Sequence, residues 1–488
     1  MTTAVRSPEV AVRSQAFIAG QWVAADGGGT FAVTNPATDE VLAHVPNCGA
    51  PETRRAIAAA HSALPAWRSR PAQERAAILR TWAQLMLRDR ERLARILTLE
   101  QGKPITEARV EIAYAASFLD WYADEARRVY GETIPSSAAD KRLLVLPRPI
   151  GVVAAITPWN FPSAMITRKT AAALAAGCTQ VVKPAEDTPL SALALAELSV
   201  EAGVPAGVFN VVTGAPEAIA GELFANPLVR KVSFTGSTEI GRLLVKASAT
   251  NLTRLSLELG GHAPFLVFAD SDLDRAVDGA IASKFRNAGQ TCVCANRIYV
   301  EESIREAFVA KLAAKTAALV VGDGLDEATQ IGPLINDDAV TKVMGHVDDA
   351  RAKGGRVVTG GARATVAGRA ARFVAPTIID AARDEMRCAS EETFGPVAPI
   401  FSFASEAEVI ERANATPYGL AAYCFTRDGA RIMRMAESLE YGIVGINDAI
   451  PATAQAPFGG VKHSGYGKEG GHHGIEEYLV RTYVSWRL

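Results

Sequence analysis

Cys292 stands in a sequence context that suits a nucleophile. It follows the small-residue loop Gly289-Gln290-Thr291, and Cys294 comes two residues later. A thiolate on such a loop can attack an electrophilic carbon and form a covalent intermediate. A lone cysteine is more often buried and inert, as a small apolar residue. This motif alone therefore leaves both interpretations open.

Two further motifs carry side chains that could assist such an attack. Asn160 lies in the segment TPWNFP, where two prolines make a rigid turn, so its amide is suited to donate to a developing oxyanion. Glu258 is followed by Leu259 and by two glycines, which let the backbone approach a ligand closely. A carboxylate in that position is a candidate general base.

Two other motifs suit a dinucleotide. Gly236 and Ser237 precede a helical pattern, and such a helix start offers free N–H groups and a positive dipole end to a pyrophosphate. The segment lacks the G-x-G-x-x-G fingerprint, so an ordinary capped turn is the alternative. Lys183 and Glu186 can both bind a ribose, and a carboxylate there would repel a 2′-phosphate, which favours NAD over NADP. The alternative for this pair is a solvated ion pair.

The elements that must position these residues alternate between strands and helices. Strands are predicted at 152–157, 179–183, 208–213, 231–235 and 254–259, with a helical pattern after each of the first four. This alternation predicts a parallel sheet with crossover helices, which binds ligands at the carboxyl ends of its strands. Most of the motifs above lie at those ends. A second α/β alternation runs from about 263 to 447.

The remaining segments frame these two alternations. Residues 1–16 are predicted to form a mobile arm, 16–45 strands, 51–130 helices and 141–150 an extended segment. The helical region includes one continuous pattern that stops at Gly102. The tail, 475–488, is predicted to be an apolar strand, which needs a partner edge and therefore suggests oligomer contacts.

Composition narrows the class of protein. A chain of 488 residues suggests three structural units, and 51 basic against 53 acidic residues give a net charge of −2, which argues against nucleic-acid binding. No apolar run is long enough for a membrane span or a signal peptide. The six cysteines are sparse, and no second close Cys/His pair suggests a metal site. We expect a cytoplasmic protein with reduced thiols.

Seven motifs in a fixed order resemble the NAD(P)-dependent aldehyde dehydrogenase family. They are TPWNFP, KPAE, FTGSTEIG, ELGG, GQTC, EETFGP and PFGG, and the resemblance runs from about Phe17 to the C-terminus. Within the family, SKFRNAGQTCVCANR and KPAEDTPLSALALAEL are most similar to succinate-semialdehyde dehydrogenases. The resemblance implies an α/β fold in three parts. A Rossmann-type cofactor domain would comprise 1–130 and 150–258, and an α/β catalytic domain 259–462. A small oligomerisation sheet would comprise 131–149 and 463–488, in a homodimer or homotetramer.

The resemblance also implies a mechanism. Cys292 attacks the aldehyde to form a thiohemiacetal, whose oxyanion is held by Asn160 and by the Cys292 backbone N–H. Hydride transfer to the nicotinamide leaves a thioester, which Glu258 hydrolyses by activating water. Lys169 and Glu469 match positions linked to proton relay in the family. The Glu258-type base is usually absent from relatives that acylate coenzyme A, so its presence disfavours that alternative. The intact Cys292, Glu258 and Asn160 also disfavour a catalytically silent relative.

The family implies further contacts for the cofactor. NAD is expected to be preferred over NADP. The matching positions are Ile156, Thr157, Trp159, Lys183, Glu186, Gly236, Ser237, Gly241, Leu259, Glu392 and Phe394.

The family implies substrate contacts as well. Arg168 and Arg286 match a carboxylate-binding pair, and Phe458 matches a tunnel wall. The loop serine of succinate-semialdehyde dehydrogenases aligns with Ala452, which leaves Thr453 as a substitute. The two arginines predict succinate semialdehyde as substrate, and the loss of the serine at Ala452 counts against this prediction. The alternatives are glutarate semialdehyde, a general aliphatic or aromatic aldehyde, and a purely structural role for the two arginines.

The Cys-Val-Cys spacing suggests redox control. Two extended residues at i and i+2 point to the same side of the chain, so Cys292 and Cys294 are predicted to form a reversible disulfide, although their Cα separation would be near the upper limit. Other family members use this spacing in the same way.

Overall fold

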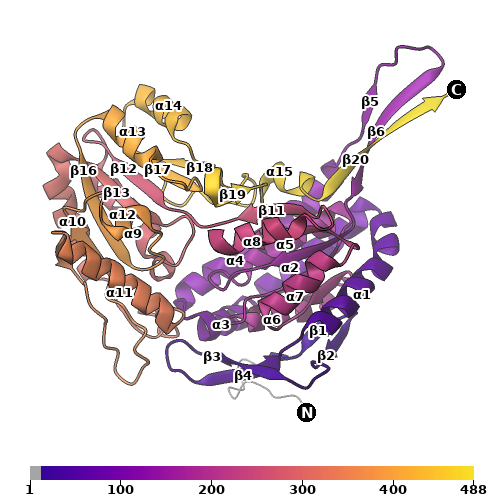
Figure 1. Ribbon diagram of the computed structural model, residues 1–488, viewed down its shortest axis with the longest axis horizontal. Helices are drawn as coiled ribbons and strands as arrows, with labels where there is room; N and C mark the ends of the chain where they lie inside the picture. Colours follow the sequence, from indigo (N-terminus) through magenta and orange to yellow (C-terminus); the bar gives the residue numbers. More distant parts are fainter. Residues whose placement is uncertain (1–11) are drawn as a thin grey trace.

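The computed structural model describes residues 12–488 (Figure 1). Residues 1–11, which include most of the predicted mobile arm, lie outside the described residues. Two α/β units, each built on its own sheet, lie side by side, and a thin three-stranded arm projects from one of them (Figure 1). The predicted α/β class is confirmed.

The larger sheet contains the strands that carry most of the predicted site. Its parallel strands are β7 (Val152–Ile156), β8 (Thr179–Lys183), β9 (Phe209–Val211), β10 (Val229–Thr235) and β11 (Arg254–Glu258). They lie in the order β11-β10-β7-β8-β9, so the chain moves outward in one direction from β7 and in the other from β10. Sheets of this kind usually bind ligands at the carboxyl ends of the strands where the direction reverses, here β7 and β10. Antiparallel strands complete its edges: β1 (Ala16–Ile18), β2 (Gln21–Val23) and β19 (Gly465–Tyr466).

Helices cover both faces of this sheet, which is why its strands are apolar at nearly every position. Val153 and Ala155 of β7 face the core under α5 (Ala164–Ala176) and α6 (Pro189–Glu201). The alternate residues of β7 face a second core, which includes α1 (Ala50–Ser69), α7 (Pro216–Ala225) and α8 (Thr238–Ser248). α5 is rich in alanine, a strong helix former, and ends at Gly177, whose φ of 94° suits a glycine at a helix end.

A helical layer packs outside α5 and α6. It consists of α2 (Ala72–Arg88), α3 (Arg90–Gln101) and α4 (Ile105–Glu125), followed by the short η2 (Ala126–Arg128). The predicted continuous helix up to Gly102 is wrong in one respect, because the chain breaks at Asp89, where ψ is 17°. Gly102 ends α3 in the left-handed conformation, with a φ of 86°, as predicted. An N-terminal hairpin, β3 (Thr30–Thr34) and β4 (Val41–Pro46), lies beside this unit (Figure 1).

The second unit is built on a seven-stranded sheet in which one edge strand is antiparallel. Its order is β14 (Arg356–Thr359), β15 (Thr377–Asp380), β16 (Val397–Phe403), β13 (Ala295–Glu301), β12 (Ala263–Val267), β17 (Ala421–Phe425) and β18 (Ile443–Ile446). Its helices are α9 (Leu273–Phe285), α10 (Arg305–Ala317), α11 (Asp337–Ala352), α12 (Arg387–Ser390), α13 (Glu406–Asn414) and α14 (Gly429–Ser438), with short turns η3 (Arg286–Gly289) and η4 (Glu302–Ile304). α11 was not predicted, although its Asn336 cap and acidic first turn are standard start signals.

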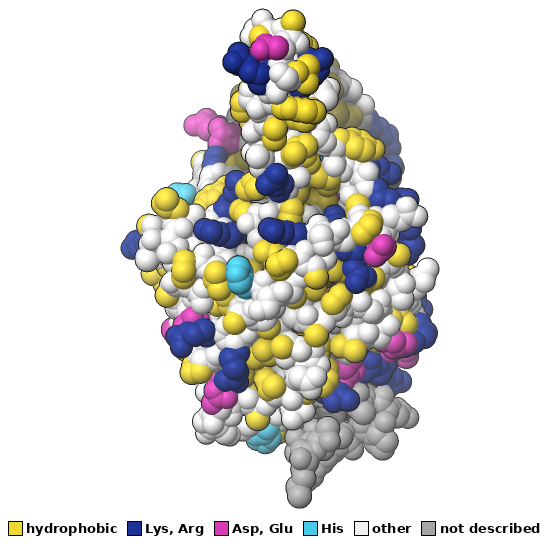
Figure 2. Space-filling view, turned by 90° about the vertical axis from the view of Figure 1, so that its right-hand side faces the viewer, with side chains coloured by type: hydrophobic (Ala, Val, Ile, Leu, Met, Phe, Trp, Pro, Cys, Tyr) yellow, Lys and Arg dark blue, Asp and Glu magenta, His cyan; other side chains and the backbone are white. Residues whose placement is uncertain are grey.

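The projecting arm is an antiparallel sheet of three strands. β6 (Lys141–Pro149) lies between β5 (Glu132–Ile134) and β20 (Leu479–Arg487), and β20 pairs with β6 along its whole length. The predicted tail strand therefore begins later than expected, because α15 (Gly471–Glu476) precedes it. The predicted sheet segment 463–488 also begins too early, because η5 (Lys462–Ser464) and β19 belong to the larger unit. Figure 2 shows apolar side chains on the arm, and the exposed ones include Ile134, Leu146, Tyr483 and Trp486.

Within residues 12–488, we find no helix whose length and apolar content would let it cross a membrane.

Candidate active site

A cavity of about 570 Å³ brings residues of the two α/β units together. The larger unit contributes Phe161, Met165 and Arg168, and the second unit contributes Phe285 and Arg286. Cys292 lines the same cavity. The cavity is therefore lined mainly by apolar side chains, with a thiol and two guanidinium groups facing the same space.

Cys292 is presented by a loop with unusual backbone geometry. Asn287 and Ala288 have φ values of 50° and 53°, a left-handed conformation that costs energy for residues other than glycine. Gly289 follows at a φ of 75°, and a side chain there would lie 2.2 Å from the carbonyl oxygen of Gly395. Burial raises the pKa of the Cys292 thiol to about 12, although the charges of Arg168 and Arg286 oppose this shift. Attack by Cys292 therefore requires a base to take its proton.

Asn160 lies immediately after β7 and is aimed at the nucleophile loop. Its side-chain Nδ2 donates to the carbonyl oxygen of Gln290 at 3.0 Å. The second hydrogen on this nitrogen is available to another acceptor, and Asn160 itself is buried. This arrangement suits a donor to an oxyanion that forms next to Cys292.

Glu258 ends β11 in a buried setting. Its Oε2 has no hydrogen-bond partner among residues 12–488, and a side chain at Gly459 would lie 2.8 Å from its Oε1. A side chain at Gly261 would meet the carbonyl oxygen of Cys292 at 2.2 Å, so the segment after Glu258 packs directly against the nucleophile. Burial raises the pKa of Glu258 well above its usual range, and the negative charge of Glu469 adds to this effect. Such a carboxyl is suited to accept and release protons near neutral pH.

Lys169 and Glu469 form a buried ion pair. Lys169 also donates to the hydroxyl of Thr235 at 2.5 Å, and Arg168 Nε lies 3.0 Å from Glu469 Oε2. Although burial opposes ionisation of Glu469, Lys169 and Arg168 outweigh it, so its pKa lies below the usual value. Arg168 therefore faces the cavity and also forms an ion pair with Glu469. The structural ion-pair role given above as an alternative for Arg168 is thus present beside its place on the cavity wall.

The residues predicted to hold the cofactor follow the strand ends of the larger sheet. Ile156 ends β7, and the Thr157 N–H donates to Lys183 O at 3.1 Å. Lys183 is buried and pairs with Glu186, whose side chain is 41% exposed. This placement suits recognition of a ribose better than a fully solvated ion pair does, because the ammonium is held in place.

A helix start stands at the end of β10. Gly236 precedes Ser237, which caps α8 by accepting from Ile240 N at 3.3 Å. A side chain at Gly241 would lie 2.6 Å from Leu259, so glycine lets α8 pack closely against the end of β11. Ser237 satisfies only one N–H of this helix start, so the capped turn is compatible with a phosphate site there.

Glu392 and Phe394 lie between the two units. Glu392 accepts from Gly261 N at 3.0 Å, and burial raises its pKa to about 7. Phe394 has a φ of 55°, and its ring packs edge-on against Trp159 with centroids 5.6 Å apart. A carboxylate beside a buried lysine, a capped helix start and an aromatic pair are groups that suit a nicotinamide dinucleotide.

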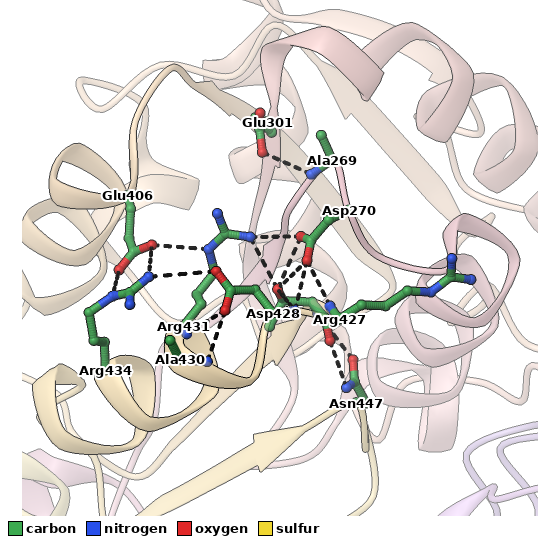
Figure 3. A network of polar contacts seen from close by, with 11 residues as sticks. Ala269, Asp270, Glu301, Glu406, Arg427, Asp428, Ala430, Arg431, Arg434 and Asn447 are labelled. Carbon is green, nitrogen blue, oxygen red and sulfur yellow. Dashed lines mark hydrogen bonds and ion pairs between the residues drawn. The ribbon is translucent and has the colours of Figure 1, made fainter.

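Residues 448–457 form a loop that lines the cavity and follows Asn447 at the end of β18; we call it the substrate loop. Asn447 has a φ of 52°, accepts from Thr426 N at 3.1 Å and donates to Thr426 O at 2.9 Å. Asp270 in turn accepts from Thr426, from the following backbone N–H groups and from Arg431 (Figure 3). The anchoring role of Asn447 was missed in the sequence, where only its place between a strand and a loop signals it.

The loop and its surroundings contribute mostly apolar groups to the cavity. Ile450, Ala452 and Phe458 lie on the wall, whereas the Thr453 hydroxyl is hydrogen-bonded to Gln455. Arg168 lies over the ring of Phe458 at 3.9 Å. Arg286 Nε is buried and has no hydrogen-bond partner in the described chain.

Cys294 faces away from this cavity. It is buried against Lys284, whose ammonium lies 3.3 Å from its sulfur. Residues 291–294 form a turn in which Cys294 N donates to Thr291 O at 3.1 Å, so the expected extended geometry is wrong. All six cysteines are free thiols. Among residues 12–488, no group of His, Cys, Asp and Glu side chains is arranged to hold a metal ion.

A doubly wound sheet, joined to a second α/β unit through a cavity with a cysteine, is typical of a dinucleotide-dependent oxidoreductase. The Aldehyde dehydrogenase family model matches residues 22–484, and the chain belongs to this family. It is therefore an oxidoreductase that acts on aldehydes with NAD(P).

The chain is similar to several curated enzymes over nearly its full length. It is 58% identical to an Escherichia coli succinate-semialdehyde dehydrogenase named for NADP(+), and 57% identical to a Pseudomonas putida glutarate-semialdehyde dehydrogenase, with 97% of each chain covered. A 3-sulfolactaldehyde dehydrogenase of Pseudomonas putida is 56% identical over 97% of each chain.

Solved structures share the fold. The crystal structure of an E. coli NADP-dependent enzyme has a TM-score of 0.96 at 57% identity, covering 99% of this chain and 100% of that one. A succinate-semialdehyde dehydrogenase from Burkholderia pseudomallei has a TM-score of 0.96 at 55% identity, with the same coverage.

Proposed function

We propose that this enzyme oxidises short aldehydes that carry a terminal carboxylate, with succinate semialdehyde first and glutarate semialdehyde next. The observation that carries this proposal is the pair Arg168 and Arg286, which faces the same cavity as Cys292. Arg168 Nη2 and Arg286 Nε are buried without an acceptor among the described residues. A substrate carboxylate would satisfy both groups. The names of the similar enzymes support the same substrate class.

The substrate assignment is tested by the values of kcat/KM for a panel of aldehydes. Each charge-assisted hydrogen bond is worth about 1.5–3 kcal/mol, so succinate semialdehyde should exceed uncharged butanal by about 10²-fold or more. Panels that extend to glutarate semialdehyde and benzaldehyde rank the alternatives. A wild-type preference for uncharged or aromatic aldehydes would show that both arginines are structural.

The proposed chemistry begins with Cys292. Water takes the proton of the Cys292 thiol, after which the thiolate sulfur attacks the aldehyde carbon to form a thiohemiacetal. Asn160 Nδ2 and the Cys292 backbone N–H hold the oxyanion. A nicotinamide dinucleotide held by the strand-end residues of the larger sheet would supply the hydride acceptor. Glu258 then removes a proton from water, which attacks the Cys292 thioester, and the acid leaves as the thiol re-forms. Lys169 and Glu469 are suited to carry protons away from Glu258.

Each group of strand-end residues has a proposed part of the cofactor to hold. Gly236 and Ser237 would hold the pyrophosphate, and Lys183 and Glu186 the adenine ribose. The remaining residues enclose the nicotinamide half or shape the crevice, and they are Ile156, Thr157, Trp159, Gly241, Leu259, Glu392 and Phe394.

NAD is the proposed cofactor rather than NADP. Glu186 stands where a 2′-phosphate would approach, and like charges in a partly buried crevice repel by up to a few kcal/mol. The ratio of kcat/KM for NAD over NADP should therefore be well above one, and Glu186→Ser should reduce it. Equal use of both cofactors by the wild type would refute the role of Glu186.

We further propose that the arm joins copies of this chain into a homodimer or homotetramer that works in the cytoplasm. Its exposed apolar residues, Leu146, Tyr483 and Trp486 among them, support an interface, and the six free thiols suit a reducing compartment. In each copy, the cofactor domain is proposed to comprise 1–130 and 150–258, and the catalytic domain 259–462. Sedimentation of the wild type against Tyr483→Asp tests the assembly.

A further inference from the structure

We propose that Lys103, Glu107 and Asn287 act as a polar clamp that sets the position of Asn160 relative to Cys292. This inference rests on the proposed function, in which Asn160 stabilises the oxyanion. None of the three clamp residues is assigned a chemical step. They are positioning residues that act through Asn160.

Two donors hold the main-chain carbonyl of Asn160. Lys103 Nζ donates to it at 2.8 Å, and Asn287 Nδ2 donates to it at 3.0 Å. Lys103 is fully buried and forms an ion pair with Glu111. Because both donors converge on one oxygen, rotation of the TPWNFP turn would break two hydrogen bonds inside a buried site, where unpaired groups are costly.

The ion pair also fixes the helix that follows the turn. Glu111 Oε1 accepts from the N–H groups of Ser163 and Ala164 at 3.0 and 3.3 Å. These N–H groups belong to the first turn of α5, where a carboxylate is favourable. Lys103 and Glu111 therefore hold the turn at the Asn160 carbonyl and at the residues that follow it.

Glu107 holds Asn287, one of the two donors to the Asn160 carbonyl. One turn before Glu111 on α4, it accepts from the backbone N–H of Asn287 at 2.8 Å. Asn287 has the left-handed φ of 50° described above, so this bond helps to maintain a strained conformation. Asn287 Nδ2 also donates to Gln290 O, the same oxygen that accepts from Asn160 Nδ2.

The clamp thereby links two parts that come from different units. Glu107, Lys103 and Asn160 belong to the larger unit, and Asn287 and Cys292 belong to the second. The distance between oxyanion donor and nucleophile is set by hydrogen bonds across this boundary, and a displacement of about 1 Å can cost about 10²-fold in rate.

The test is a double-mutant cycle between Glu107 and Asn160, with the single-turnover rate of NADH formation as the readout. Asn160→Ala should slow this step by about 10²-fold, as expected for a lost oxyanion donor. Glu107→Leu should slow it by about tenfold or more. The double variant should be no slower than Asn160→Ala, because a residue that acts through Asn160 has nothing left to position. Additive losses would overturn the clamp.

Glu107→Gln is the matched control, because its amide oxygen can still accept from Asn287 N–H. It should recover most of the rate lost in Glu107→Leu, whereas equal losses in both variants would show that the charge matters and the geometry does not. The ratio of kcat/KM for succinate semialdehyde over butanal should stay within about threefold of wild type in Glu107→Leu, and a larger change would indicate a binding role instead.

Two further results keep the inference separate from the proposed function. An undiminished rate in Asn160→Ala would refute the oxyanion role itself, whereas a slow Asn160→Ala beside an unchanged Glu107→Leu would refute the clamp alone. If Glu107→Leu does not fold, Asn287→Gly replaces it in the cycle. Glycine accepts the positive φ and keeps the N–H that Glu107 binds, so this variant removes only the donors to Asn160 O and Gln290 O.

Discussion

The two sides of the cavity are held in place by different means. The nucleophile loop and the TPWNFP turn are tied to each other by side-chain hydrogen bonds that cross between the units, from Asn160 Nδ2 to Gln290 O and from Asn287 Nδ2 to Asn160 O. The substrate loop 448–457 is instead anchored at Asn447, and it presents apolar side chains to the cavity. The first side is built for fixed geometry, and the second can change its side chains without disturbing the first. We therefore expect changes on the first side to alter the rate for every aldehyde, and changes around the substrate to alter the ratio between aldehydes.

The largest effects should come from Cys292 and Glu258. Cys292→Ala should abolish oxidation. Glu258→Gln should still form NADH in a first turnover, but it should hydrolyse the thioester about 10²–10⁴-fold more slowly, for all aldehydes alike. Rapid mixing that resolves the first turnover from the steady state measures both steps. Undiminished steady-state turnover in Glu258→Gln would refute the assignment.

The pH dependence of hydrolysis has a definite sign. Glu258 acts as a base only when deprotonated, and its pKa is raised by burial, with the charge of Glu469 adding to the shift. Hydrolysis should therefore fall as the pH drops through a value well above the usual carboxyl range, and this limb should be missing in Glu258→Gln. A limb near the ordinary carboxyl pKa would contradict the buried setting of Glu258.

The next largest effect should come from Arg286, where a substitution should change the ratio of kcat/KM between charged and uncharged aldehydes. Arg286→Met should lower kcat/KM for succinate semialdehyde by about 10-fold or more, mainly through KM, because one charge-assisted bond is lost. Butanal should be nearly unaffected. Arg286 is a better position for this test than Arg168, because the loss of Arg168 would also remove an ion-pair partner of Glu469. An equal loss for both aldehydes would place Arg286 with the fixed side of the cavity.

A smaller change of ratio is expected at Ala452. Ala452→Ser adds a hydroxyl to the wall without enlarging the side chain much, and one neutral hydrogen bond is worth about 0.5–1.5 kcal/mol. The preference for succinate semialdehyde over glutarate semialdehyde should rise by a few-fold. A fall in kcat for butanal as well would mean that the substrate loop influences the chemical step.

The smallest effect should concern how far activity recovers after oxidation by peroxide. If Cys292 and Cys294 form a disulfide under peroxide, the turn at 291–294 and the contact of Cys294 with Lys284 must rearrange first. Wild-type activity should then return with a thiol reductant, whereas Cys294→Ala should recover poorly, because its Cys292 oxidises further. Identical recovery in both would dismiss the disulfide.

Much of the fold could be predicted because it depends on local patterns. The five central strands and the helices between them follow from apolar runs and their spacing, and the polar residues at their ends followed with them. The break at Asp89 and the helix α15 could not be recognised, since the apolar pattern of the sequence continues through each of them. α11 was overlooked although its signals were present.

The site divides in the same way. Cys292, Asn160 and Glu258 stand in short motifs, so their candidacy is visible in the sequence, whereas their roles remain proposals. The pairing of Arg168 with Glu469 and the hydrogen bond from the Asn287 N–H to Glu107 join residues far apart in the chain. No local pattern marks such pairs, because the partner of each is decided by how the two units pack.

The arm has a consequence for the order in which the protein is made. β6 lies at Lys141–Pro149, and β20, which covers its second edge, lies at Leu479–Arg487. During synthesis, β6 therefore emerges with only β5 beside it, and its other edge stays open until residues 479–487 have been made. An open edge is a template for any strand that can reach it, including β20 of a neighbouring nascent copy. Until residues 479–487 have been made and paired, strand exchange between copies therefore competes with closure of each chain's own arm.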